Sequence, residues 1–162
     1  MHLTENLGEE QPTLLTLPAR RVAYREMRGD LEEMPAALIH LQAWMRQQSL
    51  EPDGDAGIAY FPALDPTRPE PRWEVRCPVA PETPDRAPDL SGCGIKTLEP
   101  VTVAVVRHTG PYVEIGAAYS RLLPWLMGQG ISPGWPVEEA FVPDPSVEEE
   151  DAFFTEIRVP VQ

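Results

Sequence analysis

The pattern of hydrophobic and polar positions repeats the same order of elements twice along this chain. Residues 20–27 and 102–108 read as strands, and the second of them is rich in β-branched side chains. Helical spacing of apolar residues follows each strand, over residues 34–48 and 113–127. Two further strand patterns then close each half: residues 58–61 with 73–79, and residues 138–142 with 152–159.

Sliding the chain along itself by 81 positions superposes landmarks of the two halves. Trp44 falls on Trp125, and Pro62 falls on Pro143. With one more residue of shift, the segment that begins at Glu74 falls on the segment that begins at Glu156. A match of tryptophans and prolines in the same order indicates an internal duplication.

Together these patterns predict an α+β fold built from a duplicated βαββ unit with pseudo-two-fold symmetry. We expect an N-terminal extension (1–19) and one domain (20–162) made of repeats 20–79 and 94–162, joined by a proline-rich linker (80–93). Residues 94–98 add a short strand. One helix covers only one face of a small sheet, so we expect antiparallel sheets from both halves to flank a central groove, a usual place for a ligand.

Charge and composition narrow the class of protein. A net charge of −13 repels phosphate backbones, which argues against direct nucleic-acid binding; it attracts cations, or serves solubility alone. The first 18 residues do not resemble a signal peptide and no stretch is apolar enough for a membrane span, so we expect a cytoplasmic protein without membrane contact. Two cysteines and three scattered histidines predict no metal site and no cofactor.

The closing strands carry the candidate ligand carboxylates. Side chains alternate along a strand, so Glu74 and Glu156 point away from the helices if the apolar face of each strand lies under its helix. A carboxylate among aromatic rings suits an organic cation. The alternative is that each Glu-x-Arg pair forms an ion pair on a wet sheet face.

Aromatic residues complete the predicted ligand site. Their candidates are Tyr60, Tyr112, Phe141, Phe154 and Trp125. Trp44 and Trp125 also fit a role in packing the helices, and Tyr119 lies on the apolar stripe of its helix. Pro124 lies inside the second helical pattern, where it removes a backbone donor.

Three segments of the second half resemble a known family: Val103-Ala-Val-Val-Arg-His-Thr-Gly-Pro-Tyr112, the helix end Leu-Leu-Pro-Trp-Leu126, and Phe154-Thr-Glu-Ile-Arg-Val-Pro-Val161. They are similar to the GyrI-like (gyrase-inhibitor-like) domain, which is also the effector-binding part of AraC-type and MerR-type multidrug regulators. The resemblance implies a duplicated GyrI-like or SOUL-like fold. It further implies that Glu156, and through the repeat Glu74, recognises hydrophobic, aromatic or cationic compounds in the groove.

The resemblance leaves several functions open. A stand-alone binding module for drug-like molecules is the first. Some members of the family are hydrolases that open cyclopropane rings of DNA-alkylating natural products, and in that case Glu156 and Glu74 are the candidate catalytic carboxylates. Modulation of gyrase is the third. We expect no helix-turn-helix before residue 20, and the sequence does not predict the oligomeric state.

Overall fold

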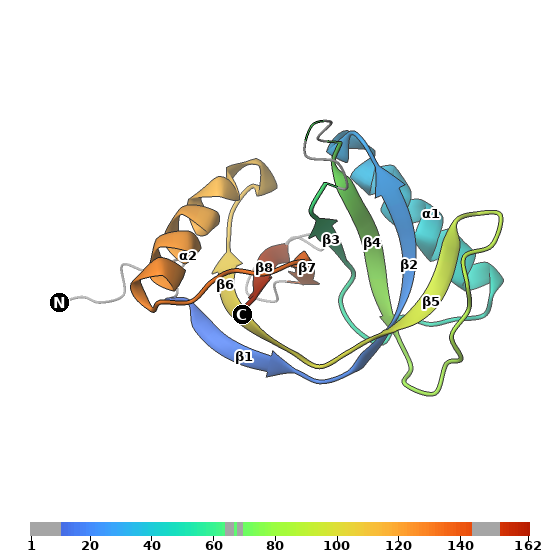
Figure 1. The fold of residues 1–162 in the computed structure, drawn as a ribbon. Coiled ribbons are helices and arrows are strands. Elements are labelled where there is room, and N and C mark those ends of the chain that lie inside the picture. The colour runs from blue at the N-terminus through green and yellow to red at the C-terminus, as the bar shows by residue number, and fades with distance from the viewer. Residues whose placement is uncertain (1–10, 64–66, 68–69, 144–152) are drawn as a thin grey trace. The chain divides into compact units, whose positions relative to one another are not determined.

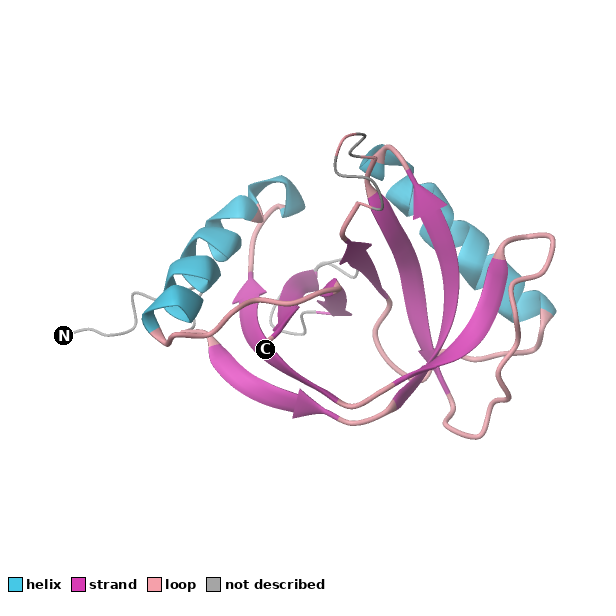
Figure 2. Ribbon diagram, in the orientation of Figure 1, coloured by secondary structure: helices cyan, strands magenta, loops and turns pink. Residues whose placement is uncertain are grey.

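In the computed structural model, which describes residues 11–63, 67, 70–143 and 153–162, the chain divides into two units. The first-repeat unit is Pro18–Val101. The second-repeat unit joins the chain up to Leu17 with Thr102–Gln162. Each unit is a sheet with one helix (Figures 1 and 2). The α+β class and the duplicated arrangement of elements are thus confirmed.

The first-repeat unit has the strand order β5-β2-β4-β3, with antiparallel pairing throughout. Its helix α1 packs against β4 and β2. The elements are β2 (Arg20–Arg28), η2 (Leu31–Glu33), α1 (Met34–Gln47), β3 (Gly57–Phe61), β4 (Arg72–Val79) and β5 (Cys93–Leu98).

Helix α1 forms because its apolar residues recur every three or four positions, and Ala37, Leu41 and Trp44 are buried. Asp30 and Glu33 together resemble a capping box, but the structure separates their roles. The Asp30 carboxylate accepts from the backbone N–H of Glu32 and caps the short 3-10 helix η2, while α1 itself starts without a side-chain cap.

The second-repeat unit has the strand order β1-β6-β8-β7. Strand β8 pairs antiparallel with both β6 and β7. The elements are β1 (Thr13–Leu17), β6 (Val101–His108), η3 (Tyr112–Glu114), α2 (Gly116–Gly128), β7 (Val137–Pro143) and β8 (Phe153–Pro160). Residue 152 of the expected last strand, and the acidic run at 148–151, lie outside the described residues.

The core of the second-repeat unit fixes which sheet face α2 covers. Leu122 and Leu126 of α2 pack with Val106 of β6 and Ile157 of β8, all fully or nearly fully buried. Burial of each such side chain contributes about 1.5–3 kcal/mol. The α2 side of this sheet is therefore the face of Val106 and Ile157, and residues that alternate with them lie on the opposite face.

Helix α2 begins at Gly116, later than the expected start at residue 113, because η3 occupies Tyr112–Glu114. Gly110, at a φ of 106°, and Pro111 make the turn that precedes η3. Pro124 lies inside α2, which runs on to Gly128.

The N-terminal region contains a strand, β1, that the sequence did not predict. Residues 1–19 were set apart as an extension, yet Thr13–Leu17 is a strand next to β6, where the Thr16 and Thr102 hydroxyls lie 3.1 Å apart. A shift of 81 places Leu17 on Leu98 of β5. The leading strand of each repeat thus belongs to the sheet of the other repeat.

Two further sequence expectations concern membranes and thiols. Among the described residues, neither helix has the length and apolar character needed to cross a bilayer. Cys77 and Cys93 are free thiols and both are buried.

Candidate functional site

Glu156 lies on β8, on the sheet face opposite α2, because it alternates with Ile157. Its carboxylate accepts from Arg158 at 2.7 Å, and Arg107 Nε lies 3.9 Å away. Arg158 also donates to Glu138 on β7 at 2.9 Å. Burial lowers the pKa of the Arg158 guanidinium, but Glu138 and Glu156 outweigh it and raise that pKa above its usual value.

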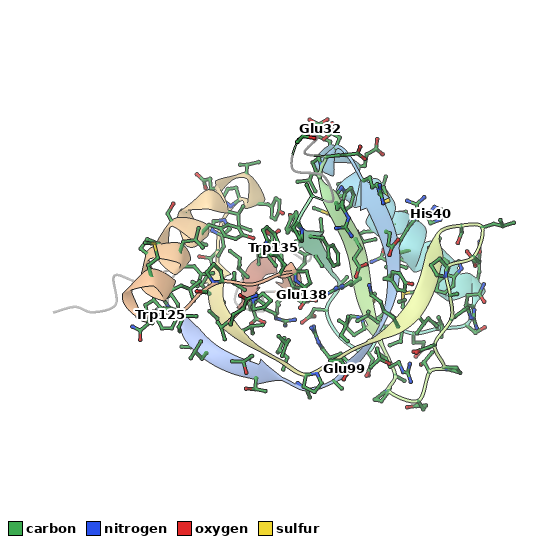
Figure 3. All side chains as sticks on the ribbon, in the orientation of Figure 1. Glu32, His40, Glu99, Trp125, Trp135 and Glu138 are labelled. Atoms are coloured by element: carbon green, nitrogen blue, oxygen red, sulfur yellow. The ribbon has the colours of Figure 1, made fainter. Side chains whose placement is uncertain are left out.

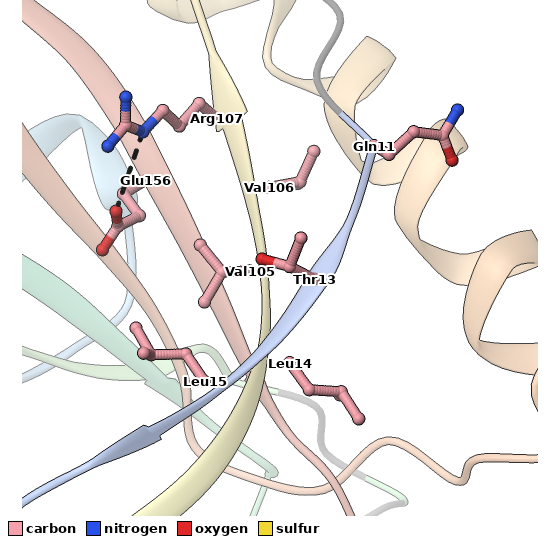
Figure 4. Close-up of a pocket in the computed structure, with 8 residues that line it drawn as sticks. All are labelled: Gln11, Thr13, Leu14, Leu15, Val105, Val106, Arg107 and Glu156. Carbon is pink, nitrogen blue, oxygen red and sulfur yellow. Dashed lines mark ion pairs between the residues drawn. The ribbon is translucent and has the colours of Figure 1, made fainter.

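A pocket of about 210 Å³ borders Glu156 in the second-repeat unit (Figure 4). Its wall combines the ion pair of Arg107 and Glu156 with the side chains of Leu14 and Leu15 on β1. Arg107 lies over the ring of Phe154, 4.6 Å from its centroid. The predicted residues Glu156 and Phe154 therefore share one arginine as a neighbour.

Glu74 lies on β4 of the first-repeat unit and is only 1% exposed. Its Oε2 accepts from Arg76 Nε at 2.5 Å, and its Oε1 accepts from Lys96 Nζ at 2.8 Å. In both closing strands the Glu-x-Arg motif thus forms an ion pair, as in the alternative interpretation, but the pair of Glu74 and Arg76 is buried and does not lie on a wet sheet face. Whether either carboxylate contacts a ligand stays a prediction.

The predicted aromatic residues have different surroundings. Tyr112 and Phe141 meet edge to face, with ring centroids 6.0 Å apart. Trp125 lies on α2 (Figure 3). It packs against the core of the second-repeat unit, which fits the packing role. Tyr60 is half-buried on β3 of the first-repeat unit.

The most developed polar cluster centres on Glu139 of β7, a residue that the sequence analysis did not single out. Its side chain is 2% exposed. The Tyr112 hydroxyl donates to Oε1 and the Tyr119 hydroxyl donates to Oε2, each at 2.5 Å. Phe141, two residues along β7, holds its ring against Tyr112. One buried carboxylate thus accepts from two tyrosines, and a third aromatic ring packs against one of these tyrosines.

This tyrosine–glutamate cluster lies on the α2 side of its sheet. Glu139 stands opposite Ile157 in the register of β7 and β8, and Ile157 packs under α2. Tyr119 belongs to α2 itself, while Tyr112 comes from η3. Burial and the Glu139 carboxylate both raise the pKa of the Tyr119 hydroxyl, so this phenol remains a hydrogen-bond donor at neutral pH.

Comparison of the repeats shows that the fold does not need this carboxylate. The residue 81 positions before Glu139 is Ile58, which is fully buried on β3. Tyr112 and Tyr119 likewise correspond to Leu31 and Leu38. An acidic residue that falls on a core isoleucine was the signal in the sequence. A residue that breaks a rule of folding, such as a carboxylate at a core position, is typical of a functional site when the fold does not require it.

The residues of the cluster provide a negative charge, two phenol groups and apolar ring surface. This set can attract an organic cation through charge and through the faces of the rings. Within the described parts of the chain, no group of three or more His, Cys, Asp or Glu side chains could hold a metal ion.

A family model describes this combination of fold and sequence. The model of the GyrI-like small molecule binding domain matches residues 10–162. The chain belongs to the GyrI-like family. Its match starts close to β1, so this GyrI-like domain takes in the strand that sequence analysis had assigned to an extension. No curated protein matches the sequence.

Solved structures share the GyrI-like fold at low sequence identity. The C-terminal domain of EcmrR has a TM-score of 0.73 at 18% identity, over 94% of this chain and 97% of the other. A hydrolase from Listeria innocua has a TM-score of 0.65 at 14% identity, over 94% and 92%. SAV2435 bound to tetraphenylphosphonium has a TM-score of 0.57 at 13% identity, over 94% of both chains.

Proposed function

We propose that this GyrI-like protein binds hydrophobic organic cations, and that Glu139 provides the negative charge that recognises them. The observation that carries this proposal is the buried Glu139 carboxylate, which accepts from Tyr112 and Tyr119, together with the Phe141 ring that packs against Tyr112. A cation over aromatic rings gains about 0.5–2 kcal/mol per contact, more where water is excluded. A buried carboxylate adds a Coulomb attraction that is screened less than at the surface.

Two further facts support the same class of ligand. The related structure of SAV2435 was solved with tetraphenylphosphonium, a large hydrophobic cation. The net charge of −13 favours the approach of cations over that of anions. The protein would act as a sequestering protein or as a sensor of such compounds.

A calorimetric titration with two ions of the same shape tests the role of charge. Tetraphenylphosphonium and tetraphenylborate present the same four phenyl rings around opposite charges. We expect the cation to bind at least tenfold more tightly than the borate, a difference of about 1.4 kcal/mol. Equal affinities, or tighter binding of the borate, would contradict recognition by a carboxylate.

The same titration separates Glu139 from the carboxylate predicted from the sequence. Glu156 already accepts from Arg158 and lies near Arg107, so its charge is partly compensated. If Glu139 recognises the cation, Glu156→Gln should change the affinity for tetraphenylphosphonium less than Glu139→Gln does. A larger loss of affinity in Glu156→Gln than in Glu139→Gln would instead favour a cation site at Glu156 on β8.

A hydrolase is the second candidate, and one observation favours it. A carboxylate that accepts from two phenols in a buried site has the groups needed for general acid–base catalysis. A structurally similar protein is described as a hydrolase. Glu74, by contrast, is held by Arg76 and Lys96.

The hydrolase candidate is tested by incubating the protein with a cyclopropane-bearing alkylator and following ring opening by mass spectrometry. A rate above that of buffer, lost in Glu139→Gln, would establish catalysis through this carboxylate. A rate equal to that of buffer would exclude this substrate class. Catalysis that persists in Glu139→Gln but is lost in a Glu74→Gln, Glu156→Gln double variant would favour the closing-strand carboxylates.

A further inference from the structure

The two Glu-x-Arg pairs of the closing strands have different charged neighbours. In the second-repeat unit, Arg158 contacts a second carboxylate, that of Glu138. In the first-repeat unit, Gly57 stands opposite Arg76 at the position where Glu138 stands opposite Arg158. A second cation, Lys96, completes the group there instead.

The first-repeat group has one carboxylate and two cations. Glu74 binds Arg76 through one oxygen and Lys96 through the other, so both oxygens are engaged. Arg76 is 5% exposed, whereas the Lys96 side chain is 30% exposed and reaches solvent. An ammonium carries three N–H donors, and Glu74 takes one of them. Lys96 therefore presents positive charge outward while Glu74 fixes its position.

A pocket of about 110 Å³ opens beside this group, wholly within the first-repeat unit. The Phe61 ring forms part of its wall, and three cations lie over that ring. The distances to the ring centroid are 5.5 Å for Arg72, 5.9 Å for Arg76 and 6.0 Å for Lys96. Lys96 also lies 4.2 Å from the centre of the Tyr24 ring.

Positive charge exceeds negative charge around this pocket. Three cationic side chains, Arg28, Arg72 and Lys96, line it together with two carboxylates, Glu26 and Glu74. This local excess of positive charge contrasts with the net charge of −13 of the whole chain. Without Lys96, the charges that line the pocket would balance. The other repeat has no basic residue at the equivalent position, because Leu15 stands 81 positions before Lys96.

We propose that the pocket of Lys96, Arg72 and Phe61 binds a small oxyanion, either a carboxylate or a phosphate group. Arginine and lysine donors form charge-assisted hydrogen bonds to such oxygens. A volume of about 110 Å³ is below the roughly 150 Å³ of a cavity that holds benzene, so the pocket takes the anionic head of a ligand.

This oxyanion pocket does not rest on the proposed binding of cations. Its residues come from the first-repeat unit, whereas the tyrosine–glutamate cluster belongs to the second-repeat unit. The oxyanion pocket would bind a ligand whose charge is opposite to that of the cations proposed for the tyrosine–glutamate cluster.

A titration followed by two-dimensional ¹⁵N–¹H NMR tests the proposal on the full chain at low salt, with sodium benzoate and inorganic phosphate as separate probes. We expect saturable shifts of backbone amides of β4 and β5 for at least one probe. Lys96→Gln should weaken that affinity about tenfold, the equivalent of about 1.4 kcal/mol. Binding of benzoate alone assigns the pocket to carboxylates, and binding of phosphate alone assigns it to phosphates.

The variants are chosen so that loss of folding cannot imitate loss of binding. Lys96→Gln leaves Arg76 to pair with Glu74, and the spectrum itself reports whether the fold is kept. Arg72→Gln, which removes a cation that donates to the Pro62 carbonyl, gives a second test from another strand. Arg46→Gln, on the exposed side of α1, removes one positive charge away from the pocket and should leave the affinity unchanged.

Two results would overturn the oxyanion pocket. The first is the absence of saturable shifts for both probes in the wild-type protein. The second is an affinity that Lys96→Gln and Arg72→Gln weaken no more than Arg46→Gln does, because the binding would then be a response to overall charge.

Discussion

Glu139 occupies a position where the fold accepts an apolar side chain, since Ile58 at the equivalent place of the first repeat is fully buried. Burying a carboxylate costs free energy unless hydrogen bonds compensate it. The hydroxyls of Tyr112 and Tyr119 supply such bonds, and the equivalent positions of the first repeat hold leucines. The carboxylate and its two donors thus occur together in one repeat, and the other repeat has apolar residues at all three positions.

The stability of the protein in alkali depends on Tyr119. Burial, together with Glu139, raises the pKa of its hydroxyl in the folded state. An unfolded tyrosine ionises near pH 10, so the contribution of this group to stability is complete below about pH 10 and falls as the pH rises further. We expect the free energy of unfolding of the wild-type protein to fall more steeply above pH 10 than that of Tyr119→Phe.

Urea unfolding of both proteins at pH 9 and pH 11 measures this difference. The Tyr119→Phe variant retains every other tyrosine, so the comparison isolates mainly the ionisation of Tyr119. Parallel losses of stability between the two pH values would contradict a raised pKa at Tyr119.

The sequence alone could have indicated Glu139 as an unusual residue, but not the groups that surround it. The acidic residue at an isoleucine position was visible once the repeats were aligned. Its two phenol partners come from η3 and from α2, and no spacing along the chain brings Tyr112 and Tyr119 to one carboxylate. The carboxylates of the closing strands were found because alternation alone places them, but their arginine and lysine contacts depend on the fold.

At the scale of elements, the helices and most strands follow from hydrophobic spacing, which is why their predicted ranges lie close to those observed. Strand β1 was missed because Thr13–Leu17 is short and precedes the repeats as they had been drawn. The same shift of 81 would have placed it on β5. Its pairing with β6 cannot be read from local sequence, because the partner is far along the chain.

Helix α2 stabilises the second-repeat unit through the side chains that it buries against β6 and β8. Leu122 is fully buried in that core, whereas its neighbour Leu123 is 44% exposed. We expect Leu122→Ala to lower the free energy of unfolding by about 2–5 kcal/mol. Leu123→Ala should change it by less than about 1 kcal/mol, because a half-exposed side chain leaves no closed cavity.

Chemical denaturation followed by circular dichroism distinguishes the two leucine variants. The paired design holds helix propensity constant, since both substitutions place alanine in the same helix. Equal losses for the two variants would mean that α2 does not pack as described.

At the scale of the whole molecule, the repeats keep one set of elements but carry different chemistry. The second-repeat unit has a buried carboxylate among tyrosines, and the first-repeat unit has a cationic pocket beside Phe61. Duplication therefore preserved the positions of strands and helices while the groups on them diverged. The groove expected between the repeats stays a prediction.

The total charge of −13 governs encounters with other macromolecules. We expect no binding to duplex DNA near 0.15 M salt, because too few phosphates could be neutralised to release counterions. An electrophoretic mobility assay at protein concentrations up to tens of micromolar measures this. A retarded band that disappears with added salt would contradict the expectation.

Isothermal titration of tetraphenylphosphonium into the wild-type protein and into Glu139→Gln tests the central claim most directly. Glutamine keeps the size of the side chain and an acceptor for a phenol, so the variant removes mainly the charge. We predict at least tenfold weaker binding in Glu139→Gln, with Glu114→Gln, an exposed change in the same unit, unchanged. An affinity of Glu139→Gln within twofold of the wild-type value would contradict the account.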